Sequence, residues 1–337
     1  MHFFTDKPFN CGKYTEFKNA RLYSIVGADL AEKGKIIQII SEIFSECRQE
    51  LYFSPFERRI PCALYLPELN SLVACNYNES MHSGTMTRYY DSSRVMSGSF
   101  SAIEEIFSYT MAQSRMYMEK SLDLIGITDL LFKEYVRNGT ELLERDKLKN
   151  YAYRKISSML DRKKGGAAVY SKAVSAVTCG GYRFAEFPED YTIIRLCDDY
   201  IAASRCFVKT ASDTANKLGY ETIVCHAVDS ENAPLHLVIP EAKTAFLSDS
   251  QVLPIKQFEE SRRVGLVRFY ESQIMESREH YITFFGGYIK KMLSEAILYS
   301  RICMDIKNQG RKLMIPYISE KKSADISSEI VSNILNS

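Results

Sequence analysis

A glycine and a lysine early in the chain, Gly27 and Lys33, are the residues whose types and spacing best suit a chemical role. They match part of the pattern Gly-x-x-x-x-Gly-Lys-Ser/Thr. In that pattern glycines let the backbone wrap phosphate groups, the lysine meets their charge and the hydroxyl binds magnesium. Glu32 stands at the second glycine position and Gly34 at the hydroxyl position. We therefore expect a partial nucleotide-binding site at Gly27, Lys33 and Gly34. Lys35 would assist from the start of the following helix.

The corresponding stretch of the second half runs from Asp198 to Arg205 and has neither the glycines nor the lysine of the pattern. Asp198 and Asp199 would repel a triphosphate from a site that normally attracts one. Acidic residues at a helix start also stabilise the helix through its dipole, by about 0.3–1 kcal/mol each. We interpret this stretch as a structural helix start rather than a phosphate site.

Magnesium at such sites is held by an acidic residue at the end of a neighbouring apolar strand. Asp249 follows the apolar run Ala245-Phe246-Leu247-Ser248 and is the candidate magnesium ligand, whereas the first half has Asn76 at the repeat-equivalent position. One half thus has the glycine and lysine without the aspartate, and the other has the aspartate without the loop. A composite site between the halves is one alternative, but a turn-capping role for Asp249 is favoured without a partner loop.

Two other regions could carry chemistry. Cys225, His226 and His236 are residues of the types that bind zinc. Adjacent strand residues point to opposite faces, however, and a fourth ligand is missing, so a buried cysteine and a hydrogen-bonded histidine are expected. The long loop from Asn76 to Ser99 follows the carboxyl end of a strand, where open α/β sheets bind ligands. This loop is the expected location of any retained binding function.

An internal repeat positions these residues. Asn10-Cys11-Gly12-Lys13-Tyr14 is echoed 168 positions later by Thr178-Cys179-Gly180-Gly181-Tyr182, and Leu66 to Asn76 is echoed 173 positions later by Ile239 to Asp249. The shared order and nearly constant spacing indicate a duplicated unit. A basic, glycine-containing break at residues 162–166 marks the expected boundary. We therefore predict two domains, at residues 1–165 and 166–337.

Each half is predicted to open with a strand that leads through a loop into an amphipathic helix. The first helix contains Ile36, Ile37, Ile39, Ile40, Ile43 and Phe44, and the second contains Phe207, Val208, Ala211, Ala215 and Leu218, with Gly219 as its end. Expected strands are 21–26, 62–66 and 71–75 in the first half, and 191–196, 221–226 and 244–247 in the second. Whether 62–66 corresponds to 221–226 stays open.

The rest of each half is expected to be mostly helical, at 102–126 and 264–306, with an interruption near Gly286-Gly287. Alternating strands and helices favour an α/β class, with two related domains that each contain a sheet flanked by helices. The strands 71–75 and 244–247 are apolar on successive residues, which is typical of a parallel sheet covered on both faces.

With these elements in place, the chain resembles the bacterial tandem P-loop ATPases, nucleotide-kinase-like proteins whose two halves each carry a phosphate loop. The resemblance covers most of the chain. It rests on the strand entering each loop, on residues 217–226, on His236 to Glu241 before the strand ending in Asp249, and on the C-terminal helix 325–335. It implies two tandem P-loop-NTPase-like domains with helical extensions, and ATP with Mg²⁺ as the ligand. Intact members have the full glycine-rich loop, from which both halves of this chain depart.

The composition of the chain limits the classes of partner that we expect it to bind. The chain has 337 residues, of which 46% are hydrophobic and 25% charged, and a formal net charge of +1, so no global field favours nucleic acid or an anionic membrane. Nine scattered cysteines without a C-x-x-C pair indicate reduced thiols. The N-terminus lacks the pattern of a secretory signal, and no apolar run reaches about 18–20 residues. We expect a soluble, cytoplasmic protein with no membrane or nucleic-acid partner.

Three hypotheses follow from the sequence. The leading one is a degenerate nucleotide-binding protein or non-catalytic pseudo-ATPase with a P-loop fold. The second is an active ATPase or nucleotide kinase with a variant loop, in which Lys33 contacts the β- and γ-phosphates and Asp249 or a nearby acid holds magnesium. The third is a protein-interaction module that binds no nucleotide.

Overall fold

The computed structural model describes residues 2–4, 17, 19–27, 30–75, 87–96, 101–163, 167–227 and 230–336. Several features expected from the sequence lie outside these residues: the repeat segment 10–14, Asn76 with most of the loop that follows it, and the boundary residues 164–166. The described part of the chain forms two compact units. Unit 1 contains Met1–Glu119 and Tyr299–Ser337, and unit 2 contains Lys120–Leu298.

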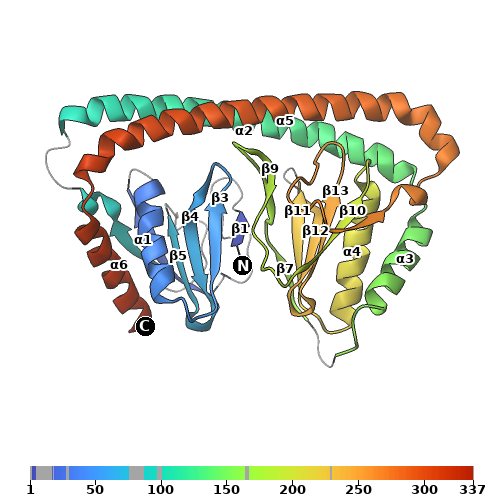
Figure 1. Ribbon diagram of the computed structural model, residues 1–337, viewed down its shortest axis with the longest axis horizontal. Coiled ribbons are helices and arrows are strands. Elements are labelled where there is room, and N and C mark those ends of the chain that lie inside the picture. Colours follow the sequence, from blue (N-terminus) through green and yellow to red (C-terminus); the bar gives the residue numbers. More distant parts are fainter. Residues whose placement is uncertain are drawn as a thin grey trace. The chain divides into compact units, whose positions relative to one another are not determined.

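Unit 1 contains a mixed sheet which, within the described residues, has six strands in the order β1-β3-β4-β5-β2-β6 (Figure 1). The strands are β1 (His2–Phe4), β2 (Arg21–Val26), β3 (Glu50–Ser54), β4 (Glu57–Leu66), β5 (Ser71–Cys75) and β6 (Thr87–Asp91). β2 is parallel to β5 and β6, whereas β4 is antiparallel to both of its neighbours. Helix α1 (Leu30–Ile43) packs on one face of this sheet, mainly over β4.

Unit 2 repeats this strand order in its own described residues, with β7-β11-β12-β13-β10-β14 in the places of β1-β3-β4-β5-β2-β6. The strands are β7 (Val169–Ser171), β10 (Thr192–Cys197), β11 (Thr222–Ala227), β12 (Ser230–Ile239), β13 (Thr244–Asp249) and β14 (Arg262–Gly265). Each parallel or antiparallel pairing matches its counterpart. Helix α4 (Ala202–Lys217) corresponds to α1, and the hairpin of β8 (Ser175–Thr178) and β9 (Gly181–Phe184) belongs to the same unit.

Local details of the two sheets also coincide. A 3₁₀ turn headed by proline precedes β5 and β13, and it ends in a left-handed residue, Asn70 (φ 45°) or Lys243 (φ 46°). The carbonyl of that residue accepts from the first amide of β2 or β10, at 2.8 Å in unit 1 and 2.7 Å in unit 2. The same turn therefore sets the start of β2 in unit 1 and of β10 in unit 2. It thereby fixes where the loop after each of these two strands begins.

Of the remaining helices, two contribute residues to both units and two are exchanged between the halves of the sequence. They are α2 (Ser101–Glu141), α3 (Arg145–Ser157), α5 (Ser272–Met314) and α6 (Glu320–Leu335). The last helix of the first half, α3, packs on α4 in unit 2, and the last helix of the second half, α6, packs on α1 in unit 1 (Figure 1). The amides of the capping residues Glu144 and Ser319 make the same contact, donating to Phe269 O and Val95 O at 2.8 and 2.9 Å.

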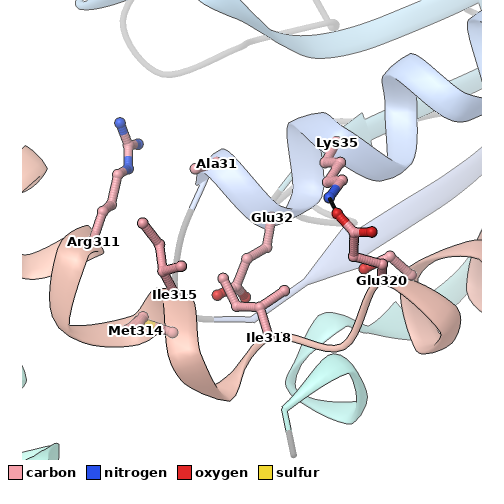
Figure 2. Close-up of a pocket in the computed structure, with 9 residues that line it drawn as sticks. Ala31, Glu32, Lys35, Arg311, Met314, Ile315, Ile318 and Glu320 are labelled. Carbon is pink, nitrogen blue, oxygen red and sulfur yellow. Dashed lines mark hydrogen bonds and ion pairs between the residues drawn. The ribbon is translucent and has the colours of Figure 1, made fainter.

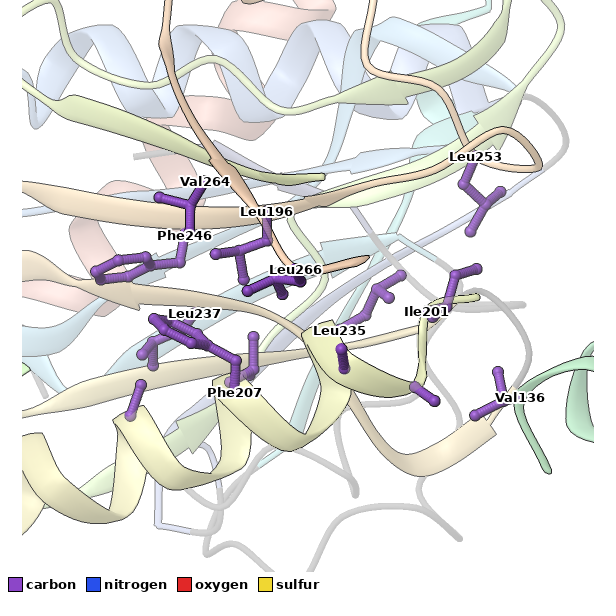
Figure 3. Close-up of a cluster of buried hydrophobic side chains, with 14 of the residues drawn as sticks. Val136, Leu196, Ile201, Phe207, Leu235, Leu237, Phe246, Leu253, Val264 and Leu266 are labelled. Carbon is purple, nitrogen blue, oxygen red and sulfur yellow. The ribbon is translucent and has the colours of Figure 1, made fainter. Parts of the chain in front are cut away.

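Each unit has its own apolar core. In unit 2, Phe207 of α4 packs against Phe246 of β13 with ring centroids 5.4 Å apart, and Leu237 lies beside them (Figure 3). Leu148, Ala152 and Ile156 of α3 extend this cluster. In unit 1, Ile36, Ile37 and Ile40 of α1 are packed with Ile326, Ile330 and Ile334 of α6. The exchanged helices thus supply part of the apolar core in each unit.

The structure confirms the α/β class and corrects several details. The sheets are mixed rather than parallel, because β4 and β12 run antiparallel to β5 and β13. Residues 62–66 lie in β4 and residues 222–226 in β11, which occupy different places in the two sheets. The predicted helix 264–306 is wrong at its start, where Val264 belongs to β14, and α5 continues through Gly286-Gly287 without interruption.

The compact units differ from the expected domains 1–165 and 166–337. That boundary separates the two sheets in sequence, but residues 120–163 belong to unit 2 and residues 299–337 to unit 1. The physical reason is the helix exchange, since α3 and α6 each bury their apolar face away from the sheet of their own half. Among the described helices, none combines the length and apolar character needed to cross a membrane.

Candidate functional site

The loop of unit 1 starts at Gly27, directly after β2. Its φ of 133° is a conformation that residues with a side chain rarely adopt. A Cβ atom at this position would also overlap with Ser92 of the 3₁₀ helix Ser92–Val95. Glycine is therefore required here by the backbone and by packing. The next two residues of the loop, Ala28 and Asp29, lie outside the described residues.

Lys33 lies in the first turns of α1 and is fully buried. Its Nζ donates a hydrogen bond to the carbonyl oxygen of Gly27 at 2.8 Å. The Lys33 ammonium group thus lies beside Gly27, the glycine with which the phosphate-loop pattern pairs it. A phosphate group could meet this charge only after the side chain had changed its hydrogen bonding.

Gly34 and Lys35 have structural partners. A Cβ atom on Gly34 would overlap with Ile60 and with the backbone of Pro61, so the glycine lets α1 approach β4 closely. Lys35 forms an ion pair with Glu320 of α6, with Nζ and Oε1 2.8 Å apart. The structure therefore brings Gly27 and Lys33 together and directs Gly34 and Lys35 to other neighbours.

A cavity of about 330 Å³ lies at the N-terminal end of α1 in unit 1 (Figure 2). Ala31, Glu32 and Lys35 contribute from α1, and the segment from Arg311 to Ser323 forms the rest of the lining. The wall from this segment is largely apolar, with Met314, Ile315 and Ile318. Its size is near the lower end of the range for small-molecule sites. No motif or spacing in the sequence indicates that residues 311–323 line this region.

Charged groups around the cavity are paired within the chain. Glu57, at the start of β4, is buried and forms ion pairs with Lys307 and Arg311 of α5. The Arg311 guanidinium, one of the cavity's cations, is thus bonded to a buried carboxylate. Glu32, a buried carboxylate in the first turn of α1, also lines the cavity (Figure 2). A carboxyl side chain thus lies where the phosphate-loop pattern has glycine, which leaves the backbone free to approach phosphate.

In unit 2 a carboxylate of the chain itself occupies the loop. Asp198 takes the place of Gly27 and is buried. Its Oδ2 accepts hydrogen bonds from Ser204 N at 2.7 Å and Ser204 Oγ at 3.1 Å, and its Oδ1 accepts from Tyr200 N at 3.1 Å and Tyr270 Oη at 2.8 Å. Burial raises the pKa of Asp198, and the hydrogen bonds from Ser204, Tyr270 and Tyr200 oppose that rise.

The amides at the start of α4 all have partners in the chain. Ala202 N donates to Tyr200 O, Ser204 N to Asp198 Oδ2 and Arg205 N to Ile201 O, at 2.7 to 3.0 Å. Ala203 N donates to Tyr270 Oη at 2.8 Å. These are the groups that a helix N-terminus offers to phosphate. These four amides of unit 2 are therefore already bonded to two backbone carbonyls and to the side chains of Asp198 and Tyr270.

Asp249, the candidate magnesium ligand, is bonded to an arginine. Its Oδ2 accepts from Arg195 Nη2 at 2.6 Å and Arg195 Nε at 3.1 Å, and its Oδ1 accepts from Ile255 N at 2.9 Å. Arg195 is buried in β10. Two guanidinium N–H groups thus hold one carboxylate oxygen of Asp249 and a backbone amide holds the other, so the carboxylate is engaged in structural hydrogen bonds.

Three of the matched positions account for the Asp198 hydrogen bonds that unit 1 lacks. Gly27, Lys33 and Met96 of unit 1 stand where unit 2 has Asp198, Ser204 and Tyr270. Tyr270 was missed from the sequence because it lies 72 residues beyond Asp198 and carries no motif. Arg195 had a detectable signal, since it is a charged residue inside the apolar run Ile193-Ile194-Arg195-Leu196.

The histidine considered as a metal ligand belongs to a buried hydrogen-bond network. His236 Nδ1 accepts from Ser248 N at 3.0 Å, so Nε2 carries the proton of the neutral ring. Nε2 lies 3.0 Å from Ser175 Oγ and 2.9 Å from Tyr182 Oη. Burial lowers the pKa of His236 to about 3. Within the described residues no cluster of three or more His, Cys, Asp or Glu could hold a metal ion.

The residues at the loops of units 1 and 2 do not form the site for ATP and Mg²⁺ that the P-loop pattern requires. In unit 2, Asp198 fills the loop and Arg195 holds Asp249. In unit 1, Lys33 is bonded to Gly27 O, and Glu32 stands at the second glycine position. Comparison of the chain with protein-family models, with curated proteins and with solved structures gives no match.

Proposed function

We propose that the chain is a non-catalytic relative of the P-loop ATPases, a pseudo-ATPase in which neither unit hydrolyses ATP. The observation that carries this proposal is the hydrogen bonding of Asp198, whose carboxylate accepts from the loop and helix amides of unit 2. An anion already bound within the chain excludes a phosphate from the same donors. Two like charges at that point would also repel each other.

The cavity at the start of α1 supports a binding role confined to unit 1. Gly27 keeps the backbone conformation of a tight loop, and the Lys33 ammonium lies 2.8 Å from the loop carbonyl. These two observations favour, as a second candidate, nucleotide binding in unit 1 without turnover. The buried Glu32 opposes it, because a carboxylate beside a triphosphate raises the free energy of the complex.

The test measures phosphate release from MgATP by the full chain, together with its thermal unfolding in ATP, ADP or GTP with and without magnesium. We expect no phosphate release above the buffer rate. A nucleotide at about 100 times its Kd would stabilise the folded state by about 2.7 kcal/mol, enough to raise the Tm by several degrees. The matched variant is Lys33→Met, which keeps an unbranched side chain, shorter by the terminal nitrogen, and removes its charge.

Each result has a defined meaning. Phosphate release that Lys33→Met abolishes would contradict the pseudo-ATPase proposal. A Tm increase without turnover, absent from Lys33→Met, would support the second candidate. Because Lys33 is buried and hydrogen-bonded, its replacement also changes the Tm of the free protein, so only the ligand-induced change within each variant is compared.

A further inference from the structure

The part of α5 in unit 2 is apolar on two faces. Its inner face is buried and consists of Ile282, Gly286, Ile289, Leu293 and Ala296. Its outer face exposes three aromatic side chains, Tyr281 (62%), Phe284 (57%) and Tyr288 (46%). The rings of Phe284 and Tyr288 contact each other, with centroids 4.7 Å apart. A helix that is apolar on both faces is normally covered on both.

The outer residues have the spacing of a helix-pairing seam. Tyr281, Phe284 and Tyr288 continue in Lys291, Glu295 and Leu298, so successive members are alternately three and four positions apart. This alternation keeps side chains on one stripe facing a partner helix. Leu298, at the end of the stripe, is 50% exposed. The partner of this seam is thus expected to be another helix with complementary side chains.

We propose that this seam binds the same seam of a second copy of the chain, with the two α5 helices antiparallel. Phe284 and Tyr288 lie two positions on either side of Gly286, and Tyr281 and Lys291 lie five positions on either side. A twofold axis at the level of Gly286 therefore places Phe284 against the partner's Tyr288. It also places Tyr281 against the partner's Lys291.

Both contacts are favourable. An aromatic pair stabilises beyond its buried area, and an ammonium over a tyrosine ring gains a cation–π interaction. Gly287 is exposed and has open space where a Cβ would be, so no side chain at that position holds the helices apart. A parallel arrangement would instead set Lys291 against the partner's Lys291, and Glu295 against the partner's Glu295. Charge therefore selects the antiparallel pairing.

The test is sedimentation equilibrium of the full chain between about 1 and 200 μM. We expect a reversible monomer–dimer equilibrium. The double variant Phe284→Ser/Tyr288→Ser should raise the dimer Kd at least roughly tenfold, because buried aromatic anchors dominate such interfaces. Lys291→Glu should raise it by a similar factor through loss of the cation–π contact. The matched control is Thr283→Ser/Lys290→Ser, which changes exposed residues outside the seam and should leave the Kd unchanged.

Cross-linking tests the direction of the pairing. Tyr281→Cys and Lys291→Cys chains, mixed under mild oxidation, should give a disulfide-linked heterodimer faster than either variant gives a homodimer. Dominant Lys291→Cys homodimers would indicate parallel helices and overturn the proposal. A chain that stays monomeric at 200 μM, or a dimer unaffected by Phe284→Ser/Tyr288→Ser, would do the same. So would a monomeric chain that sediments with vesicles of phosphatidylcholine and phosphatidylserine. None of these results depends on ATP turnover.

Discussion

At the scale of single residues, one carboxylate sets the difference between the two loops. Asp198 is buried and accepts from two backbone amides, a serine hydroxyl and a tyrosine hydroxyl. At the matched position, Gly27 provides backbone alone, and Met96 stands where Tyr270 donates its hydrogen bond. The loop of unit 2 is therefore closed by two side chains that unit 1 lacks.

Replacement of Asp198 tests this account of the loop. Asp198→Ala leaves four donors without their acceptor and should lower the free energy of unfolding by roughly 3 kcal/mol or more. Asp198→Asn keeps one oxygen for the Ser204 amide and should lose less. The measurement is urea denaturation of the full chain.

The neighbouring Asp199→Ala is the matched control, since the Asp199 side chain is only partly buried. It should change stability by less than about 1 kcal/mol. Equal losses for Asp198→Ala and Asp199→Ala would show that the carboxylate does not hold the loop.

His236 predicts a pH dependence. Its pKa is about 3 in the folded chain, whereas the ordinary pKa of histidine is 6.5, so the unfolded chain binds more protons between these pH values. The neutral ring therefore contributes stability that is complete above pH 6.5 and is lost as the pH falls toward 3. The loss should approach about 1.4 kcal/mol per pH unit within that window.

The check compares the wild-type chain with His236→Leu by urea denaturation between pH 4 and 8. Subtracting the two profiles removes the carboxylates that titrate in both. A wild-type profile that runs parallel to that of His236→Leu below pH 6 would rule out a buried neutral histidine.

At the scale of elements, hydrophobic periodicity was informative where one face of an element is buried. Ile36, Ile37 and Ile40 are buried on α1, and Phe207, Val208 and Ala211 on α4, as predicted. Gly219 follows α4 with φ 88°, the left-handed conformation expected after a helix end. These features depend on residues close in sequence, and they were predictable for that reason.

Elements that depend on distant contacts were missed. The full length of β4 was not expected, because Pro61 and charged residues interrupt its apolar pattern; the strand accommodates Pro61 beside a register shift. The glycines at 286 and 287 suggested a break in α5, yet Gly286 packs against Tyr135 and Val252, and the helix continues. The interpretation of Asp198 as a structural residue rather than part of a phosphate site agrees with its hydrogen bond from the Ser204 amide. Its hydrogen bond from Tyr270 could not be inferred from local sequence.

At the scale of the whole molecule, the exchanged helices make each half of the sequence depend on the other. Cutting the chain at residues 164–166, which lie outside the described residues at the predicted domain boundary, gives the fragments 1–163 and 167–337. Each fragment alone leaves an apolar helix face without its partner: α1 without α6, or α4 without α3. We expect the fragments to aggregate when expressed singly and to copurify as a one-to-one complex when coexpressed.

Ile330 provides the matched variant for this experiment. It is fully buried between α6 and α1, so Ile330→Asp in fragment 167–337 should abolish copurification. The exposed Leu335→Asp should leave it intact. Two monomeric fragments that each unfold cooperatively would show that the halves are independent domains.

The division of the chain also sets an order of events during synthesis. Unit 2 is one continuous stretch, Lys120–Leu298, whereas unit 1 joins Met1–Glu119 to Tyr299–Ser337. The apolar core of the unit that leaves the ribosome first therefore cannot be completed until the last described helix, α6, has been translated. At about 5–20 residues per second, the nascent sheet of unit 1 spends many seconds with the apolar face of α1 uncovered. Unit 1 is the first to be started and the last to be finished.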